Sequence, residues 1–244
     1  MKTFALILAA IVYLSTGAHA QNKTYFGIEF SVGNDLWEID DQGGYLVTVP
    51  LIDAQGSIHL RQEVNRNIFV EAGVLLKQYW QGFGFKTIPY YGATTSDPSW
   101  LLPVRIGVNV NVYKKKIYLV PVVGYTHGIN SPYGPFPSSP GYGTQRSSTI
   151  VVNYDYTEYP RSWRHFSLLQ RGIGLEVKVF RGSVVSLCYN HYHGLDRVVE
   201  LAIRYDVNNS PPMTGTAISK GEFWNVALGL KYPISNFWQR KLKA

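Results

Sequence analysis

The residues of this chain that could do chemistry are few, and they lie near the ends of apolar segments. The segment NHYHG places His191 and His193 two residues apart on one face of a β-strand, where they could bind zinc or copper together with His127. The tripeptide HFS places His165 and Ser167 at the same spacing. Histidine pairs of this kind at a strand end are more often exposed loop residues than ligands. We therefore expect no metal, no cofactor and no catalytic residue, and hence no enzymatic activity.

The N-terminal residues have the order of a secretory signal peptide. Lys2 precedes the apolar run FALILAAIVYL, and the small residues of STGAHA follow before Gln21. We expect residues 1–20 to be cleaved after export, which leaves one domain over residues 21–244. Cys188 is the only cysteine, so this exported domain must rely on packing or closure rather than on an intrachain disulfide. No later segment approaches the roughly 20 apolar residues of a transmembrane helix, so any membrane span must consist of strands.

The composition indicates a surface that is not entirely in water. Charged residues make up 16% of the chain and aromatic residues 14%, whereas an average soluble domain has about 25% charged residues. The formal net charge is +7, which includes Lys2 of the signal peptide. A basic exported protein could bind nucleic acid, but the sequence shows no basic groove with stacking aromatic residues. We expect outer-membrane lipid as the partner of this charge and no nucleic acid.

The segment WLLPVRIGVNVNV, residues 100–112, alternates apolar and polar side chains. Every second residue from Trp100 to Val112 is apolar, whereas the intervening positions include Arg105 and Asn109. A period of two is typical of a β-strand with unlike faces, and this run is longer than the usual globular strand. Similar patterns predict eight strands, at residues 24–39, 57–64, 68–80, 100–112, 116–128, 168–180, 183–192 and 223–234.

The connections between these strands alternate in length. Tight turns are expected at residues 65–67, 114–116 and 181–182, and long connections at about 40–56, 83–98, 130–164 and 193–221. Within the last of these, we interpret residues 197–207 as an extension of the seventh strand. Short turns at one end and long loops at the other are typical of a transmembrane β-barrel, with the turns in the periplasm and the loops outside the cell. The pattern therefore predicts an all-β fold, an eight-stranded antiparallel up-and-down transmembrane barrel.

The polar register is expected to face the lumen of this barrel. An eight-stranded barrel has an interior just wide enough to be filled by side chains, and mixed charges can pair there while the apolar register faces lipid. Cys188 falls on the inward register and is expected to pack as a small apolar side chain. The predicted lumen network consists of Glu29, Glu71, Lys77, Arg105, Glu176, Lys178 and Lys231. A secreted lipocalin-like barrel that binds a small apolar ligand is an alternative, and it would place the apolar register inside.

The hairpins resemble those of a known family of outer-membrane proteins. The segments GSIHLRQEVNRNIFVEAGVLLKQYW, SWLLPVRIGVNVNVYKKKIYLVPVVGY, GIGLEVKVFRGSVVSLCYNHYHGL and WNVALGLKYPI follow one another as in the outer-membrane protein β-barrel domain of Bacteroidota, which is similar in architecture to OmpA/OmpX-type barrels. The resemblance implies an integral outer-membrane protein, usually of unassigned molecular activity. One departure is the end of the chain: such barrels commonly finish on an aromatic residue, whereas here Tyr232, Phe237 or Trp238 would have to serve from within the sequence.

Two functional alternatives remain open from the sequence. Some eight-stranded outer-membrane barrels are lipid A deacylases with a His-x-Ser motif, and His165 and Ser167 have that spacing without the residues that normally follow. The other is a structural or surface-recognition role, without a large pore, in which the long loops bind a protein or glycan partner. We favour the second. The candidate recognition residues are the aromatic residues Tyr133, Tyr142, Tyr154, Tyr156, Tyr159 and Trp163, although such residues also occur in the aromatic girdle of a membrane barrel.

Overall fold

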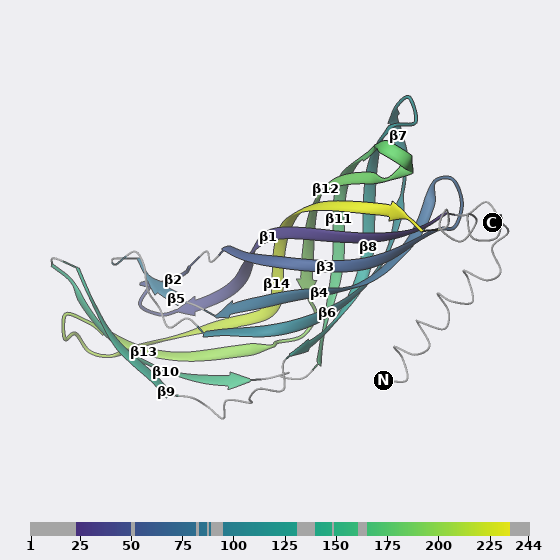
Figure 1. Cartoon of the computed structure of the whole chain (residues 1–244). Helices are drawn as coiled ribbons and strands as arrows, with labels where there is room; N and C mark the ends of the chain where they lie inside the picture. Colours follow the sequence, from purple (N-terminus) through teal and green to yellow (C-terminus); the bar gives the residue numbers. More distant parts are fainter. Residues whose placement is uncertain are drawn as a thin grey trace.

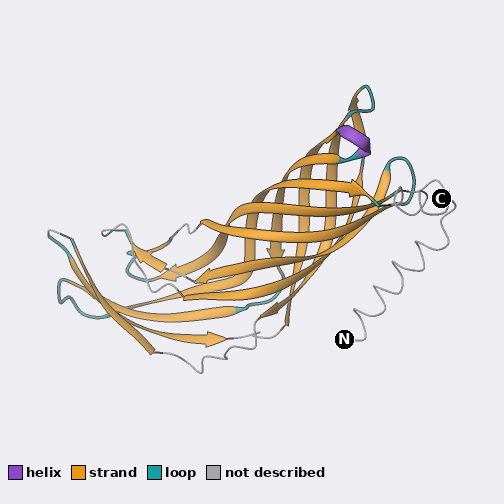
Figure 2. Cartoon of the chain, viewed as in Figure 1, coloured by secondary structure: helices purple, strands orange, loops and turns teal. Residues whose placement is uncertain are grey.

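The computed structural model is a closed β-barrel that continues at one end into an open sheet (Figures 1 and 2). It describes residues 23–49, 52–81, 83–86, 88, 95–130, 140–147, 149–160 and 165–234. The expected signal peptide, Phe237 and Trp238 lie outside the described residues. Among the described residues, no helix is long and apolar enough to cross a membrane.

The barrel is a single antiparallel sheet closed on itself. Each barrel strand pairs with the next one around the barrel, and β1 pairs with β14 from Tyr25↔Pro233 onward, which closes the ring. The predicted eight-stranded barrel is therefore confirmed. Its strands are β1 (Thr24–Asp41), β3 (Ile52–Glu63), β4 (Ile68–Gln81), β6 (Thr95–Val108), β8 (Ile117–Asn130), β11 (His165–Lys178), β12 (Val184–Gly194) and β14 (Met213–Pro233).

The three predicted tight turns gather at one end of the barrel, which we call the turn end (Figure 1). In the first, the Asn65 side chain accepts hydrogen bonds from the backbone N–H groups of Asn67 and Ile68, both at 2.8 Å. In the second, Lys114 has a positive φ of 45° after the short strand β7 (Val110–Tyr113), which pairs with β8. The third contains the 3₁₀ turn η1 (Phe180–Gly182). Short connections of this kind fix the register of the hairpins that they join.

The other end of the barrel continues into a sheet of which the sequence predicted only residues 197–207 (Figure 1). Beyond β14 the sheet adds β13 (Val199–Val207), β10 (Val151–Pro160) and β9 (Pro140–Arg146), and β2 (Leu46–Thr48) pairs with β5 (Phe83–Phe85) as a separate small sheet. We call these five strands, with the adjoining ends of β1 and β14, the extension. Much of the connection 130–164, which we expected to be a loop, is therefore a β-hairpin. Residues 197–207 do continue the seventh strand along β14, after a break between Gly194 and Val199.

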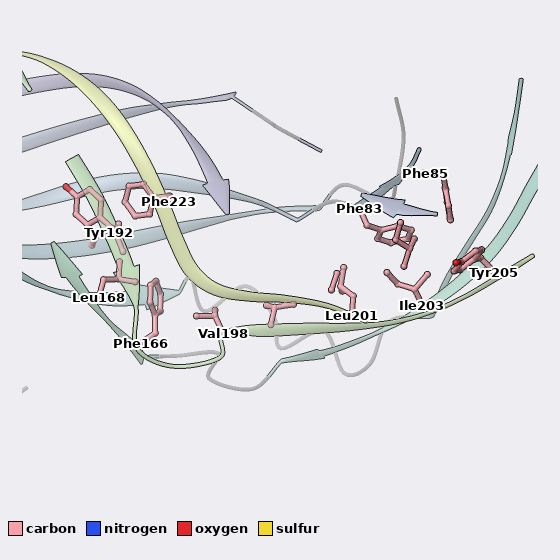
Figure 3. Close-up of a cluster of buried hydrophobic side chains, with 14 of the residues drawn as sticks. Phe83, Phe85, Phe166, Leu168, Tyr192, Val198, Leu201, Ile203, Tyr205 and Phe223 are labelled. Carbon is pink, nitrogen blue, oxygen red and sulfur yellow. The ribbon is translucent and has the colours of Figure 1, made fainter. Parts of the chain in front are cut away.

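An aromatic cluster forms the core of the extension (Figure 3). Phe83 lies edge-on to Tyr154 and Tyr156, with ring centroids 5.6 and 5.7 Å apart, and Phe85 lies 5.4 Å from Tyr205. Phe83, Phe85 and Tyr205 are almost completely buried. Edge-to-face pairs stabilise by about 0.5–1.5 kcal/mol beyond the burial of their area. Packing of β2 and β5 against the sheet therefore holds the extension together.

The outer face of the barrel is apolar over a limited height. On β1 the outward side chains from Phe26 to Val32 are apolar and exposed, and Asn34 is the first polar one. On β14 the outward side chains are apolar from Tyr232 to Trp224, and Glu222 follows. Eight residues at about 3.3 Å each and a tilt near 40° give a height of roughly 20 Å, close to the apolar band of about 25 Å in membrane barrels. The structure thus places the apolar register outside and the charges inside, opposite to the lipocalin-like alternative.

Candidate functional site: a charged lumen and a polar groove

The middle of the lumen is held by one arginine between two glutamates. Arg105 on β6 lies directly opposite Glu71 on β4 and pairs with it, and its Nη2 donates to Glu29 Oε1 on β1 at 2.9 Å. All three side chains are buried. Two buried carboxylates would repel each other without a shared cation, so Arg105 is the counter-ion that lets both remain charged.

A second group of ion pairs lies toward the turn end. Glu176 accepts hydrogen bonds from Arg61 Nη1 at 2.7 and 2.9 Å and from Lys231 Nζ at 2.6 Å. Arg61 also donates to Asn109 Oδ1 at 2.6 Å, and its guanidinium lies 3.4 Å from the centre of the Phe69 ring. The Arg61 guanidinium thus has a carboxylate, an amide and a ring as partners, which offsets the cost of burying its charge.

A third charged group lies toward the extension, beside a pair of stacked aromatic rings. Lys77 is fully buried, with Asp35 Oδ1 at 2.7 Å and Asp53 Oδ2 at 2.6 Å from its Nζ. The same Nζ lies 4.6 Å from the centre of the Phe223 ring, which stacks on Tyr192 with centroids 4.2 Å apart. Figure 3 shows this ring pair at the barrel end of the cluster that runs into the extension. Ion pairs and stacked rings therefore fill the lumen in successive layers.

The structure places six of the seven predicted lumen residues inside the barrel: Glu29, Glu71, Lys77, Arg105, Glu176 and Lys231. Lys178 lies at the mouth of the lumen, where it lines a small cavity together with Arg61, Glu176 and Lys231. It is the last residue of β11, it is exposed at the turn end, and its Nζ lies 3.0 Å from Tyr118 Oη. Cys188 is half-buried on the inward register of β12.

Sequence reasoning missed several members of the lumen network. Asp53 was assigned to a long connection, because we expected the second strand to begin five residues later than β3 does. The inward residues of that strand were visible by their period of two but were not recognised as part of the network. The missed members are Asp35, Asp53, His59, Arg61 and Asn109.

The predicted recognition residues divide between the core and the surface of the extension. Tyr154 and Tyr156 face the aromatic cluster rather than solvent, because alternate residues of β10 point into the packed face of the sheet. Tyr142, on the edge strand β9, is 90% exposed. Tyr159 lies on β10, but its side chain, like Tyr133 and Trp163, lies outside what the structure describes.

The opposite face of the extension carries a polar groove of about 340 Å³, which we call the extension groove. Asp155, Arg204 and Thr214 lie side by side across β10, β13 and β14. Ala202 and Gly215 contribute its small residues. Its polar side chains are Asp40, Gln42, Asp155, Thr157, Arg204, Thr214 and Thr216. Among the described residues, none of these polar side chains has a side-chain hydrogen bond or ion pair, so the groups are free to bind a ligand.

The four histidines of the predicted motifs, His127, His165, His191 and His193, lie on the outward face, near the limit of the apolar band on the side of the extension. His191 Nε2 and His193 Nδ1 contact the two oxygens of Glu222 at 3.2 and 3.0 Å, whereas His127 Nε2 lies 3.1 Å from His165 Nδ1. His127 is therefore paired with a different histidine from the one that the predicted metal site required. Ser167 Oγ lies 2.8 Å from the Tyr125 hydroxyl, so the HFS serine has a tyrosine partner.

No protein-family model and no curated protein sequence matches this chain. The fold is similar to that of OprG from Pseudomonas aeruginosa, with a TM-score of 0.48, 7% identity, and coverage of 86% of this chain and 96% of that one. Ail from Yersinia pestis, in complex with the heparin analogue sucrose octasulfate, gives a TM-score of 0.38, 13% identity, and coverage of 86% and 99%. The outer-membrane protein AlkL, determined in DMPC bilayers, gives a TM-score of 0.41 and 14% identity, with coverage of 87% of this chain and 91% of that one. These likenesses concern the fold alone, and membership of the Bacteroidota family stays a prediction.

Proposed function

We propose that this protein is an integral outer-membrane β-barrel that holds the extension outside the cell as a recognition surface, without enzymatic activity and without a large pore. The observation that carries this proposal is the order in which different surfaces follow one another along the barrel axis. The apolar band lies around a charged interior, and a folded sheet with its own core stands beyond the band. Tight turns mark the other end, which is typically the periplasmic end of such barrels.

The extension groove supports a role in recognition. Its free carboxylates, guanidinium and hydroxyl groups offer both donors and acceptors, and its volume of about 340 Å³ lies within the range of ligand pockets, about 300–1,000 Å³. A glycan or a polar segment of a protein presents matching groups. The proposed binding residues are therefore those of the extension groove and not Tyr154 and Tyr156, because these two side chains pack against the hydrophobic core of the extension.

The location is tested by fractionation. Cells that express the full chain should yield the mature protein in outer membranes, with faster mobility on an unboiled gel than on a boiled one. A soluble periplasmic product would contradict the membrane assignment.

Recognition is tested with the protein in lipid vesicles, screened against arrayed glycans and envelope proteins. Arg204→Ala should lower any specific binding at least about tenfold, because arginine is enriched among the few residues that dominate binding and whose truncation costs about 2 kcal/mol or more. Arg197→Ala is the matched control, since Arg197 is exposed near the same sheet but does not line the groove. Binding that is equally insensitive to both substitutions would move the recognition surface elsewhere.

A further inference from the structure

His59 is an anomaly in the lumen. Its side chain is 5% exposed, yet among the described residues neither ring nitrogen has a hydrogen-bond partner. Buried polar groups are nearly always satisfied, so an imidazole in this state calls for a partner of another kind.

The barrel makes room for this ring on both sides. Gly27 on β1 and Gly73 on β4 lie directly opposite His59 on β3. A Cβ atom at Gly27 would lie 2.0 Å from His59 Nε2, and one at Gly73 would lie 2.8 Å from His59 Cβ. A larger residue at Gly27 would displace the ring, and one at Gly73 would displace the β3 backbone that carries it. The imidazole therefore occupies a shaped site rather than an incidental gap.

Two carboxylates converge on the same nitrogen. His59 Nε2 lies 3.7 Å from Glu71 Oε2 and 4.0 Å from Glu29 Oε1, and ligand atoms of the three residues lie within 4.8 Å of one another. Glu71 Oε2 also lacks a hydrogen-bond partner among the described residues. The three side chains line a small cavity of about 20 Å³, which is room for about one water-sized group.

The buried charges of the described lumen are nearly balanced. The buried charged side chains comprise five carboxylates (Glu29, Asp35, Asp53, Glu71 and Glu176) and four basic groups (Arg61, Lys77, Arg105 and Lys231). With a neutral His59, the described part of the lumen has a net charge of −1. The surplus belongs to the group of Lys77 with Asp35 and Asp53, whereas Glu29, Glu71 and Glu176 are matched by Arg105, Arg61 and Lys231. A cation between Glu29 and Glu71 is therefore attracted by these two carboxylates themselves.

We propose that Glu29, His59 and Glu71 bind one divalent transition-metal ion, for which zinc is the probe. Imidazole and carboxylate are ligands that suit Zn²⁺, at about 2.0–2.2 Å from the ion, so the carboxylate oxygens that now lie 3.7 and 4.0 Å from Nε2 would have to move closer to it around a shared ion. Arg105 pairs with both carboxylates and orients them. Lys231, which lies 3.5 Å from Glu71 Oε2, keeps Glu176 as a partner at 2.6 Å. The ion would tie β1, β3 and β4 together inside the barrel.

The experiment uses the full mature protein refolded in detergent micelles after treatment with a chelator. Zinc alone is added, excess is removed by gel filtration, and bound zinc is measured by mass spectrometry and calorimetry at pH 7.5. We expect one zinc ion per barrel and a higher thermal unfolding midpoint. His59→Gln should weaken binding at least about 100-fold, because loss of outer-shell partners alone costs about 10–100-fold.

The matched control removes the other histidine pair. The double variant His191→Ala and His193→Ala should still bind one zinc ion, which separates the lumen site from the surface histidines beside Glu222. Unboiled gel mobility checks that each variant is folded. If His59→Gln does not fold, Co²⁺ absorption bands of the unaltered protein provide the second readout, since nitrogen and oxygen ligation changes their intensity and position.

Two results would overturn the proposal. One is that the folded protein retains no stoichiometric zinc, and the other is that His59→Gln binds zinc as well as the unaltered chain does. A ring NMR signal of His59 that is doubly protonated at pH 7.5 and unchanged by zinc would show instead that an imidazolium pairs with the two glutamates. All of these outcomes are independent of whether the extension groove binds a partner.

Discussion

Single buried residues set the energetics of the lumen, and Arg105 is the clearest case. Removing it in Arg105→Ala leaves Glu29 and Glu71 buried with one fewer cation between them, so we expect a loss of about 3–5 kcal/mol in the free energy of unfolding. Arg197→Ala is the control, because that guanidinium is 58% exposed and lies 3.8 Å from Glu200. An exposed pair of this kind stabilises by at most about 1 kcal/mol. Urea unfolding in micelles, followed by tryptophan fluorescence, measures both variants, and equal losses would contradict the assigned role of Arg105.

Residues on the outer face are constrained by lipid rather than by pairing. Leu228 lies near the middle of the apolar band, beside Phe30 and Leu187, and is 60% exposed. Leu228→Arg should cost about 2–4 kcal/mol, as expected for a charge at the bilayer midplane. Thr214→Arg, on the same face of β14 but beyond the band, should cost little. The yield of the heat-modifiable form after refolding into vesicles checks both, and equal tolerance would mean that the outward register does not face lipid.

The sequence predicted the composition of the lumen better than its pairing. A period of two sorts Glu29, Glu71 and Arg105 onto one face without any knowledge of the fold. It does not reveal that Arg61 bonds Glu176, which is 115 residues away, because that contact depends on the stagger of strands around the closed ring. The period also does not show that Lys178 lies at the exposed mouth of the lumen rather than in its buried part.

At the scale of elements, the extension contains strands that local sequence patterns do not predict. The strands β9 and β10 were hidden in a segment rich in glycine, proline and tyrosine, which has the composition of a loop. Gly141 and Gly143 lie against the rings of Tyr156 and Tyr154, so in this hairpin the glycines make room for aromatic side chains instead of breaking the strand. The stability of the hairpin depends on tertiary contact with Phe83, which no local pattern encodes.

The turn between β1 and β2 depends on one carboxylate of the extension. Asp41 accepts hydrogen bonds from the N–H groups of Leu46 at 2.7 Å and Gly43 at 3.0 Å, and from the Tyr205 hydroxyl at 2.7 Å. Partial burial acts to raise the pKa of Asp41, but these hydrogen bonds outweigh it and lower the pKa below its ordinary value of 3.8. Burial and the neighbouring Asp41 carboxylate raise the pKa of Tyr205, so the phenol remains a donor.

These shifts predict how the turn responds to pH. Because the folded-state pKa of Asp41 is lowered, its contribution to stability is fully present above 3.8 and is lost as the pH falls through the folded value. Hydrogen-exchange protection of the Leu46 amide should therefore fall in acid while that of the barrel strands persists. Asp41→Asn should show weaker protection with no such pH dependence. Protection that is unchanged in acid would show that the carboxylate does not hold the turn.

At the scale of the whole molecule, one sheet has an apolar outer face in the barrel and a polar outer face in the extension. β14 runs from the turn end to the tip of the extension, and its outward side chains change from apolar at Leu228 to charged at Glu222 and hydroxyl-bearing at Thr214. Its inward side chains change in the opposite sense, from Lys231 in the charged lumen to the buried Phe223 and Ala217. Both changes occur near Glu222 and Phe223, at the limit of the apolar band that lies closest to the extension. One continuous strand thereby carries a membrane barrel into a sheet with an apolar core of its own.

The layered filling of the lumen predicts electrical behaviour. The ion pairs of Arg105, Lys77 and Glu176 and the stacked rings of Tyr192 and Phe223 occupy successive heights, as expected for an interior only wide enough for side chains. The protein in planar bilayers should therefore show no large steady conductance. Phe223→Ala should not open a channel either, because the ion pairs of Arg105 and Glu176, which lie closer to the turn end, remain in place. A porin reconstituted in parallel controls for insertion, and a reproducible porin-like current from the unaltered chain would mean that its lumen is not closed by these side chains.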